Sequence, residues 1–331
     1  MAILVTGAAG FIGHATTRAL LARGEHVIGI DNLNPYYDPA LKHARLADLA
    51  QLNHGRFNFH ALDFADHEAL DAVLGPHDID RIVHLGAQAG VRYSIDNPRA
   101  YVQSNLVGHL NLLELARHRQ VAHCVYASSS SVYGNTAISP FSVDARVDHP
   151  VSLYAATKKA DELMSETYAH LYRVPLTGLR FFTVYGPWGR PDMALWTFTA
   201  AILQGKPIDV YNHGDMRRDF TYIDDIVAGV IAALHHPPAD DGKSKPGGSI
   251  SPHTIYNIGN NQPETLSRMI EVLEAACGNP AIRNLLPMQP GDVYETYADI
   301  NAIAHDLGYA PSTSIDTGIP RFVTWYREYT C

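Results

Sequence analysis

Residues 3–13 read Ile-Leu-Val-Thr-Gly-Ala-Ala-Gly-Phe-Ile-Gly. This short apolar run and its three evenly spaced glycines are followed by a helix-like run over residues 14–23. The order strand, glycine turn, helix is typical of a phosphate-binding loop, because the first N–H groups of a helix have no partner within it. The glycines permit the turn, the approach of a pyrophosphate and the packing of helix on strand. The predicted loop comprises Gly7, Gly10, Phe11, Ile12 and Gly13.

A carboxylate follows the second predicted strand, residues 26–30, at Asp31. Its carboxylate can accept hydrogen bonds from both ribose hydroxyls of an adenosine, and its charge repels a 2′-phosphate. No arginine follows directly, so the sequence favours NAD over NADP. A glycine turn that merely joins two core elements is the alternative, and Asp31 weighs against it.

Two further predicted strands, residues 57–62 and 81–85, run toward the same edge. Asp63 can accept from the adenine amine, with a solvated turn aspartate as the alternative. Arg92 follows the fourth strand in the crevice where open α/β sheets bind ligands. It is an anion ligand or a surface charge, and its position favours the first. Further cofactor contacts are expected from Asn32, Phe64, Leu85, Gln88 and Asn105.

The stretch from Ser128 to Lys158 carries the chemistry. Four serines end an apolar run at residues 128–131, and Tyr154 precedes Lys158 by four residues. On a helix these two side chains share a face, and an ammonium beside a phenol favours the phenolate. A hydroxyl such as Ser129 can then share a proton with that tyrosine. The layout is that of an acid–base site for a sugar or alcohol hydroxyl, whereas an exposed Tyr and Lys on a helix are the plain alternative.

Composition narrows the class of protein. The chain has 331 residues, 46% of them hydrophobic, and a net charge of −9, which disfavours nucleic acid or an anionic membrane as the main partner. Three scattered cysteines indicate a reducing compartment, and the 18 histidines show no metal-ligand spacing. No run approaches the length of a membrane span. The sequence therefore predicts a cytoplasmic protein without a metal.

The order of elements predicts a doubly wound parallel α/β sheet with a smaller, discontinuous α/β substrate domain. Residues 1–181 form the expected NAD-binding domain, which residues 224–259 rejoin. Residues 182–223 and 260–331 form the expected nucleotide-sugar domain, and residues 237–253 a mobile surface loop. Helices are expected over residues 105–117 and 263–277. The first of these and the Tyr154 helix carry apolar stripes that pack on the sheet or form a homodimer seam.

These motifs together resemble the extended short-chain dehydrogenase/reductase superfamily, specifically its NAD-dependent nucleotide-sugar epimerases. The nearest resemblance is to the UDP-glucuronate 4-epimerase group, on residues 88–94, 127–134, 182–193 and 216–222. Gly86, where relatives have alanine, and the 237–253 loop depart from the pattern. The resemblance covers most of the chain.

The resemblance implies C4 epimerisation of a UDP-sugar through a transient 4-keto intermediate. Tyr154 takes the proton of the 4-hydroxyl with help from Ser129, and Lys158 binds the nicotinamide ribose. Arg190 and Arg218 hold the diphosphate, and Asp292 the uridine ribose. In UDP-galactose epimerases an arginine stands at the position of Gln289. The set of residues that would hold the diphosphate therefore differs here from the set in those enzymes.

UDP-glucuronate is the expected substrate and UDP-galacturonate the expected product. Ser130, Ser131, Thr183 and Arg92 can supply donors to the sugar carboxylate. Similar decarboxylases carry a glutamate at Ser131, and dehydratases an Asp-Glu pair at the two serines. The alternatives are a UDP-glucose/UDP-galactose 4-epimerase and an NAD-binding sensor without turnover.

Overall fold

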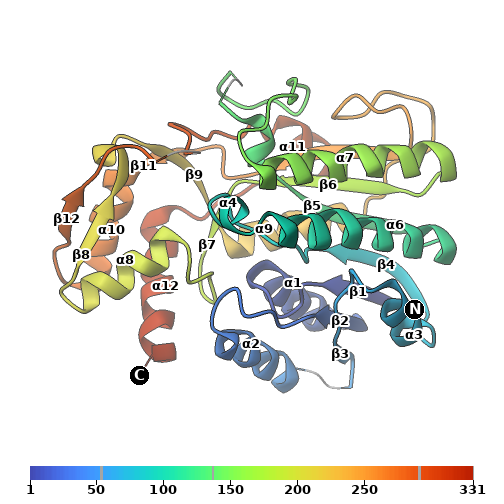
Figure 1. The fold of residues 1–331 in the computed structure, drawn as a ribbon, viewed down its shortest axis with the longest axis horizontal. Coiled ribbons are helices and arrows are strands. Elements are labelled where there is room, and N and C mark those ends of the chain that lie inside the picture. Colours follow the sequence, from blue (N-terminus) through green and yellow to red (C-terminus); the bar gives the residue numbers. More distant parts are fainter. Residues whose placement is uncertain (53–54, 136–137, 290–291, 331) are drawn as a thin grey trace.

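Seven parallel strands form the central sheet of the computed structural model, which describes residues 1–52, 55–135, 138–289 and 292–330. The strand order is β10-β6-β5-β4-β1-β2-β3 (Figure 1). Successive strands are added on one side of β1 up to β3 and on its other side from β4 onward, so the topological switch point lies between β1 and β4. The predicted doubly wound parallel sheet is confirmed. The strands are β1 (Ala2–Thr6), β2 (Val27–Asp31), β3 (Phe57–Ala61), β4 (Ile79–His84), β5 (His123–Ser129), β6 (Leu176–Phe181) and β10 (His253–Ile258).

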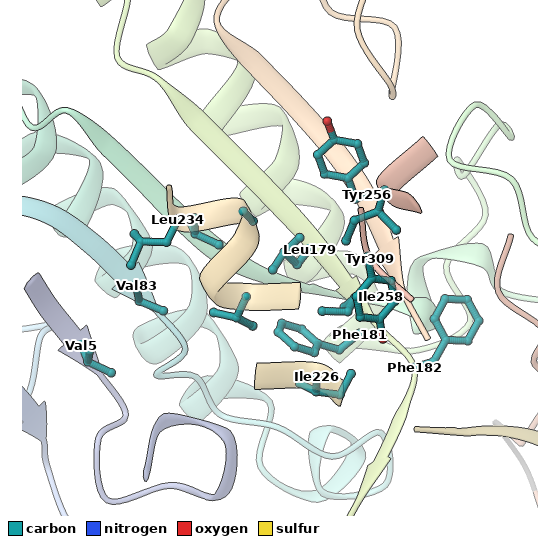
Figure 2. Packing of buried hydrophobic residues seen from close by; sticks show 14 of the residues in the cluster. Val5, Val83, Leu179, Phe181, Phe182, Ile226, Leu234, Tyr256, Ile258 and Tyr309 are labelled. Carbon is teal, nitrogen blue, oxygen red and sulfur yellow. The ribbon is translucent and has the colours of Figure 1, made fainter. Parts of the chain in front are cut away.

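Helices cover both faces of this sheet. One buried apolar cluster joins the strands to α1 (Phe11–Ala22), α2 (Pro39–Gln51), α9 (Ile223–Leu234) and α11 (Asn301–Leu307). A second cluster, on the opposite face, joins them to α3 (His67–Leu74), α6 (Gly108–Arg119) and α7 (Leu153–Tyr172). Figure 2 shows part of the first cluster, with Ile226 of α9 near Phe181 of β6 and Leu234, at the other end of α9, toward Val83 of β4. Cover on both faces explains the continuous apolar runs of the inner strands.

A smaller lobe lies beside the carboxyl ends of the strands (Figure 1). It holds a three-stranded sheet in the order β11-β9-β7 and a two-stranded sheet of β12 and β8. A third apolar cluster packs these strands against the helices of the lobe, and it also includes Phe11 of α1 and Ile223 and Val227 of α9. The elements are β7 (Thr183–Tyr185), α8 (Ala194–Leu203), β8 (Pro207–Val210), β9 (Arg217–Tyr222), β11 (Pro263–Thr265), α10 (Leu266–Cys277), β12 (Ile282–Leu285) and α12 (Ile315–Thr330).

The helix expected over residues 263–277 was placed too early. Pro263–Thr265 form strand β11, which pairs antiparallel with β9. Helix α10 begins at Leu266, where the Thr265 hydroxyl accepts a hydrogen bond of 3.1 Å from the backbone N–H of Arg268. Strand pairing thus takes three residues that the helical pattern alone assigned to the helix.

The helix expected over residues 105–117 is divided. Short helices α4 (Tyr93–Asp96) and α5 (Pro98–Tyr101) lead into a π-helical turn, Val102–Val107, and α6 begins only at Gly108. The wider turn directs Asn105 inward, where it is 1% exposed. Within the predicted apolar stripe, Leu110 is 41% exposed, whereas Leu112, Leu113 and Leu115 are buried.

The surface loop predicted over residues 237–253 is irregular over residues 237–252, whereas His253 is buried and begins β10. Two contacts tie the irregular segment to the rest of the protein. Asp240 pairs with Arg173, and the backbone N–H of Gly247 donates to Asp144 at 3.2 Å. In the part of the chain that the structure describes, no helix combines the length and apolar character needed to cross a membrane.

Candidate active site

A cleft of about 950 Å³ opens at the carboxyl ends of the strands and faces the smaller lobe. Its floor lies at the switch point between β1 and β4, where ligands of such sheets bind. Nearly every candidate site residue lines it. The lining includes Gly7, Gly10, Phe11, Ile12, Gly13, Asp31, Asn32, Phe64, Leu85, Gln88, Arg92, Ser129, Ser130, Ser131, Tyr154, Lys158, Thr183, Arg190, Arg218 and Asp292.

The glycine loop leaves no room for side chains at two positions. Gly7 has φ +69°, and a Cβ there would lie 2.8 Å from the backbone nitrogen of Gly86. A Cβ on Gly13 would lie 2.0 Å from the carbonyl oxygen of Gly7. Gly10 precedes α1 without any side-chain cap, so the first N–H groups of the helix remain open to an anion. The loop therefore fits the pyrophosphate of a dinucleotide.

Asp31 lies at the end of β2, as predicted, but it has a cationic partner. Its Oδ1 accepts from the backbone N–H of Leu33 at 2.8 Å and from Nζ of Lys42 at 3.2 Å. Lys42 belongs to α2 and is almost fully buried.

Two predicted cofactor contacts lie outside the cleft lining. Asp63 accepts from the Asn32 amide at 3.0 Å and from the backbone N–H of Ala65 at 2.9 Å. Asn105 exchanges two hydrogen bonds with the backbone of Gln88 and donates a third to Thr157. Asn105 therefore fixes the loop after β4, and its contact with a cofactor stays a prediction.

Tyr154 and Lys158 both line the cleft from the first two turns of α7. The helix begins there because Ser152 caps it, accepting from the backbone N–H of Ala155 at 3.1 Å. Tyr154 is partly buried, and its ring meets that of Tyr101 edge-on with centroids 6.0 Å apart. Lys158 is 2% exposed and donates to Asp161 at 3.0 Å. Asp161 is a partner that our sequence reasoning did not single out.

Ser128 and Ser129 end β5, and Ser130 and Ser131 begin a single 3₁₀ turn, residues 130–133. Ser129 donates to the hydroxyl of Ser131 at 3.1 Å and accepts from its backbone N–H. We expected Ser129 to share a proton with Tyr154, and the structure instead gives it Ser131 as its hydrogen-bond partner. Both Ser129 and Tyr154 still face the same cleft.

A buried ion pair supports the serines from below. Arg180 of β6 donates to both carboxylate oxygens of Glu162, at 2.8 and 3.0 Å. Ser128 donates to the same carboxylate at 2.7 Å. Arg180 and Glu162 are each 2% exposed. The pair therefore ties β5, β6 and α7 together directly beneath the catalytic candidates.

The expected clamp arginines have protein partners in this structure. Arg190 pairs with Asp192 at 2.5 Å, and Asp192 accepts from the hydroxyl of Tyr36 at 3.0 Å. Arg218 lies in the cleft wall and donates to the carbonyl oxygens of Arg217 and Tyr294. Burial lowers the pKa of Arg218, and Asp292 opposes that shift.

Arg92 bridges the two lobes at the mouth of the cleft. Its guanidinium lies 3.3 Å from Oδ2 of Asp292 and 5.2 Å from the ring centroid of Tyr211. Asp292 was expected to bind a uridine ribose and here pairs with Arg92. Both residues therefore stand where a ligand would enter.

The family model described as the NAD dependent epimerase/dehydratase family matches residues 3–259. The chain belongs to this family. A probable UDP-glucuronate 4-epimerase of Rhizobium meliloti is 47% identical over 99% of this chain and 97% of its own. The crystal structure of UDP-glucuronic acid 4-epimerase from Bacillus cereus, in complex with UDP-glucuronic acid and NAD, is 34% identical. It covers 99% of this chain and 100% of its own with a TM-score of 0.88.

The structure of UDP-glucose 4-epimerase from Thermotoga maritima with UDP-glucose is 27% identical, covers 100% of both chains and has a TM-score of 0.86. The resemblance expected from the sequence is thus confirmed. NAD is the cofactor of this family, and the loop and Asp31 fit it.

Sequence reasoning missed the residues that act through long-range pairing. Tyr36 lies 156 positions from Asp192, and no local pattern connects them. Sequence reasoning also passed over Lys42 and Arg45, which belong to none of the motifs. Asp161 carried a weak signal, since acid and base three apart on a helix are neighbours.

Proposed function

We propose that this protein is an NAD-dependent UDP-sugar 4-epimerase that converts UDP-glucuronate to UDP-galacturonate. The convergence of the dinucleotide loop, the Tyr154–Lys158 pair and the serine turn on one cleft carries the proposal. The similarity to UDP-glucuronate 4-epimerases over nearly the whole chain supports it.

Tyr154 is the acid–base residue for the sugar 4-hydroxyl. As phenolate it removes the hydroxyl proton while C4 is oxidised to the ketone, and it returns the proton after the sugar has turned. Lys158 stabilises the phenolate by its positive charge. NAD, held by the glycine loop and Asp31, would supply the acceptor for the C4 hydrogen and its two bonding electrons, and the donor of both to the opposite face of the ring. Tyr154 and the cofactor therefore finish each cycle in their starting states.

Ser129 and its neighbours orient the sugar. Ser129 donates to the 4-oxygen, and Ser130, Ser131, Thr183 and Arg92 hold the carboxylate at C6. A 4-keto uronate is a β-keto acid, which loses carbon dioxide readily. At Ser130 and Ser131 the chain lacks the acidic residues that similar decarboxylases and dehydratases carry at these positions. Neutral donors can hold the carboxylate so that its C–C bond overlaps poorly with the ketone, and epimerisation then prevails.

The nucleotide half of the substrate lies along the smaller lobe. Arg218 and Arg190 bind the diphosphate and Asp292 the uridine ribose. Asp292 must then exchange Arg92 for the ligand, and Arg190 must act together with Asp192. Truncation to Arg218→Ala is expected to weaken UDP binding, and unchanged UDP affinity would remove that role.

The NAD domain comprises residues 1–181 and 224–259, which the pairing of β10 with β6 supports.

The chain forms a homodimer through α6 and α7, whose exposed apolar side chains Leu110, Leu163 and Leu171 favour a buried seam. A cytoplasmic location agrees with free thiols at Cys124 and Cys277, and Cys331 lies outside the described residues.

Incubation with UDP-glucuronate and, separately, with UDP-glucose tests the substrate. UDP-galacturonate is the expected main product. UDP-xylose or a 4-keto pentose would mean that decarboxylation prevails, and faster turnover of UDP-glucose would reassign the serines and Arg92. Tyr154→Phe is expected to abolish turnover while NAD binding and the fold persist, and an active Tyr154→Phe enzyme would refute the mechanism.

A further inference from the structure

A buried carboxylate lies directly behind the lysine of the proposed acid–base pair. Nζ of Lys158 donates to Oδ2 of Asp161 at 3.0 Å, one helical turn further along α7. The two residues are 2% and 1% exposed. Oδ1 of Asp161 has no hydrogen-bond partner within the described ranges of the chain. The epimerisation mechanism above assigns this carboxylate no task.

Several titratable groups surround this pair on the elements packed around it. They are His84 (β4), His109 (α6), Tyr126 (β5), Arg180 (β6), His253 (β10) and Glu162 (α7).

The two nearest histidines stay neutral at working pH. Burial lowers the pKa of His84 to about 3, with Lys158 adding to the shift. Burial also lowers the pKa of His109 well below its usual value, and the rings of the two histidines stack 5.3 Å apart. Both histidines therefore stay uncharged near neutral pH and contribute no charge beside Lys158.

The remaining neighbours are neutral or paired elsewhere. Burial raises the pKa of Tyr126 well above its usual value, so its hydroxyl stays protonated and donates to His253. Glu162 is held by Arg180 through two hydrogen bonds. His253 pairs in turn with Glu166 at the surface. Of the described residues, Asp161 is thus the anion whose charge acts on Lys158.

We propose that Asp161 is a positioning residue that sets the pH range in which Tyr154 and Lys158 work as a pair. The inference rests on the proposed function of those two residues. Ionised, Asp161 holds the ammonium of Lys158 and offsets its charge. Protonated, it leaves that charge to act fully on the phenol. Burial raises the pKa of Asp161 to about 6 against the opposing effect of Lys158, so both forms occur near neutral pH.

Helix geometry gives the size of the effect. Tyr154 and Asp161 are seven positions apart on α7, which corresponds to a rise of about 10 Å. One unit charge at that distance, at an effective dielectric constant near 20, shifts a titration by about one pH unit. Removing the Asp161 charge should therefore move the acid limb of the activity profile to lower pH by up to about one unit, the full shift being reached where wild-type Asp161 is ionised.

The test is the pH dependence of kcat/KM for UDP-glucuronate between pH 5 and 9. Asp161→Asn should shift the acid limb downward by up to about one unit, and Asp161→Glu, which keeps the charge, should leave it near the wild-type position. Glu166→Gln is the matched control, because it removes a charge from the same helix further from Tyr154. It should not move the limb.

An acid limb that stays in place in Asp161→Asn would overturn the proposal, even if the rate falls at every pH. That result would give Asp161 a purely structural role. If Asp161→Asn does not fold, Asp161→Ser provides the same readout. Tyr154→Phe separates the two hypotheses. A variant that retains turnover refutes the proposed mechanism, whereas an inactive Tyr154→Phe with an unshifted Asp161→Asn refutes only the role of Asp161.

Discussion

Arg45 of α2 donates a hydrogen bond of 2.6 Å to the carbonyl oxygen of Trp188, 143 positions further along the chain. The same guanidinium donates to the carbonyl oxygens of Ala9 in the glycine loop and Gly189 beside Trp188, at 2.9 and 3.1 Å. Arg45 is fully buried. One side chain therefore joins the cofactor loop to the segment that leads into Arg190.

Replacing Arg45 by methionine should destabilise the protein and weaken NAD binding together. The variant loses these charge-assisted hydrogen bonds and leaves buried carbonyl groups unpaired, a loss on the order of 3 kcal/mol. Thermal unfolding and NAD titration measure the two effects. Arg18→Met on neighbouring α1 is the control, since Arg18 is half exposed. Unchanged NAD affinity in Arg45→Met would contradict the link.

The ion pair beneath the serines should respond strongly to loss of its anion. Glu162→Gln leaves Arg180 buried without a counter-charge, which costs about 3–5 kcal/mol of folding stability. Denaturant unfolding measures the loss. The matched change Glu271→Gln removes an exposed partner of Arg268 and should cost less than about 1 kcal/mol. Equal losses in the two variants would show that burial of the pair is unimportant.

Local patterns were enough to predict the parallel sheet, the glycine loop and the placement of Tyr154 and Lys158. Each depends on spacing within one strand–turn–helix unit. The partners of these residues were not predictable, because the Arg45–Trp188 and Tyr36–Asp192 contacts depend on how the two lobes meet. The start of α10 was misjudged for a related reason, since pairing of β11 with β9 is a tertiary effect.

The buried histidine at the start of β5 should make the protein sensitive to acid. His123 is fully buried, and burial lowers its pKa to about 4 from an ordinary value of 6.5. The unfolded chain therefore takes up a proton more readily than the folded one below pH 6.5. The stability from neutral His123 is complete above pH 6.5 and is lost as pH falls toward 4. The full loss is on the order of 3 kcal/mol.

His123→Gln should flatten the fall in stability over that pH window. The comparison is the free energy of unfolding at pH 7 and pH 5 for each variant. His118→Gln, which changes an exposed histidine on α6, should leave the wild-type slope intact. A slope that is the same in His123→Gln and wild type would mean that other groups dominate acid unfolding.

Asp31 and Lys42 together should control the choice between NAD and NADP. The carboxylate of Asp31 repels a 2′-phosphate, while the ammonium of Lys42, 3.2 Å away, would attract one. In Asp31→Ser the lysine loses its anionic partner and becomes free to pair with the phosphate. The ratio of the NADP and NAD dissociation constants should therefore fall by about 100-fold, which corresponds to about 2.7 kcal/mol.

The double variant Asp31→Ser/Lys42→Met separates the two contributions. If Lys42 attracts the phosphate, the double variant should lose the gained NADP affinity and keep the weakened NAD affinity of the single variant. Isothermal titration with each dinucleotide measures both. Equal NADP affinity in the single and double variants would assign the effect to lost repulsion by Asp31 alone. An unchanged preference for NAD in Asp31→Ser would mean that the shape of the loop after β2, where Leu33 has φ +53°, excludes the phosphate instead.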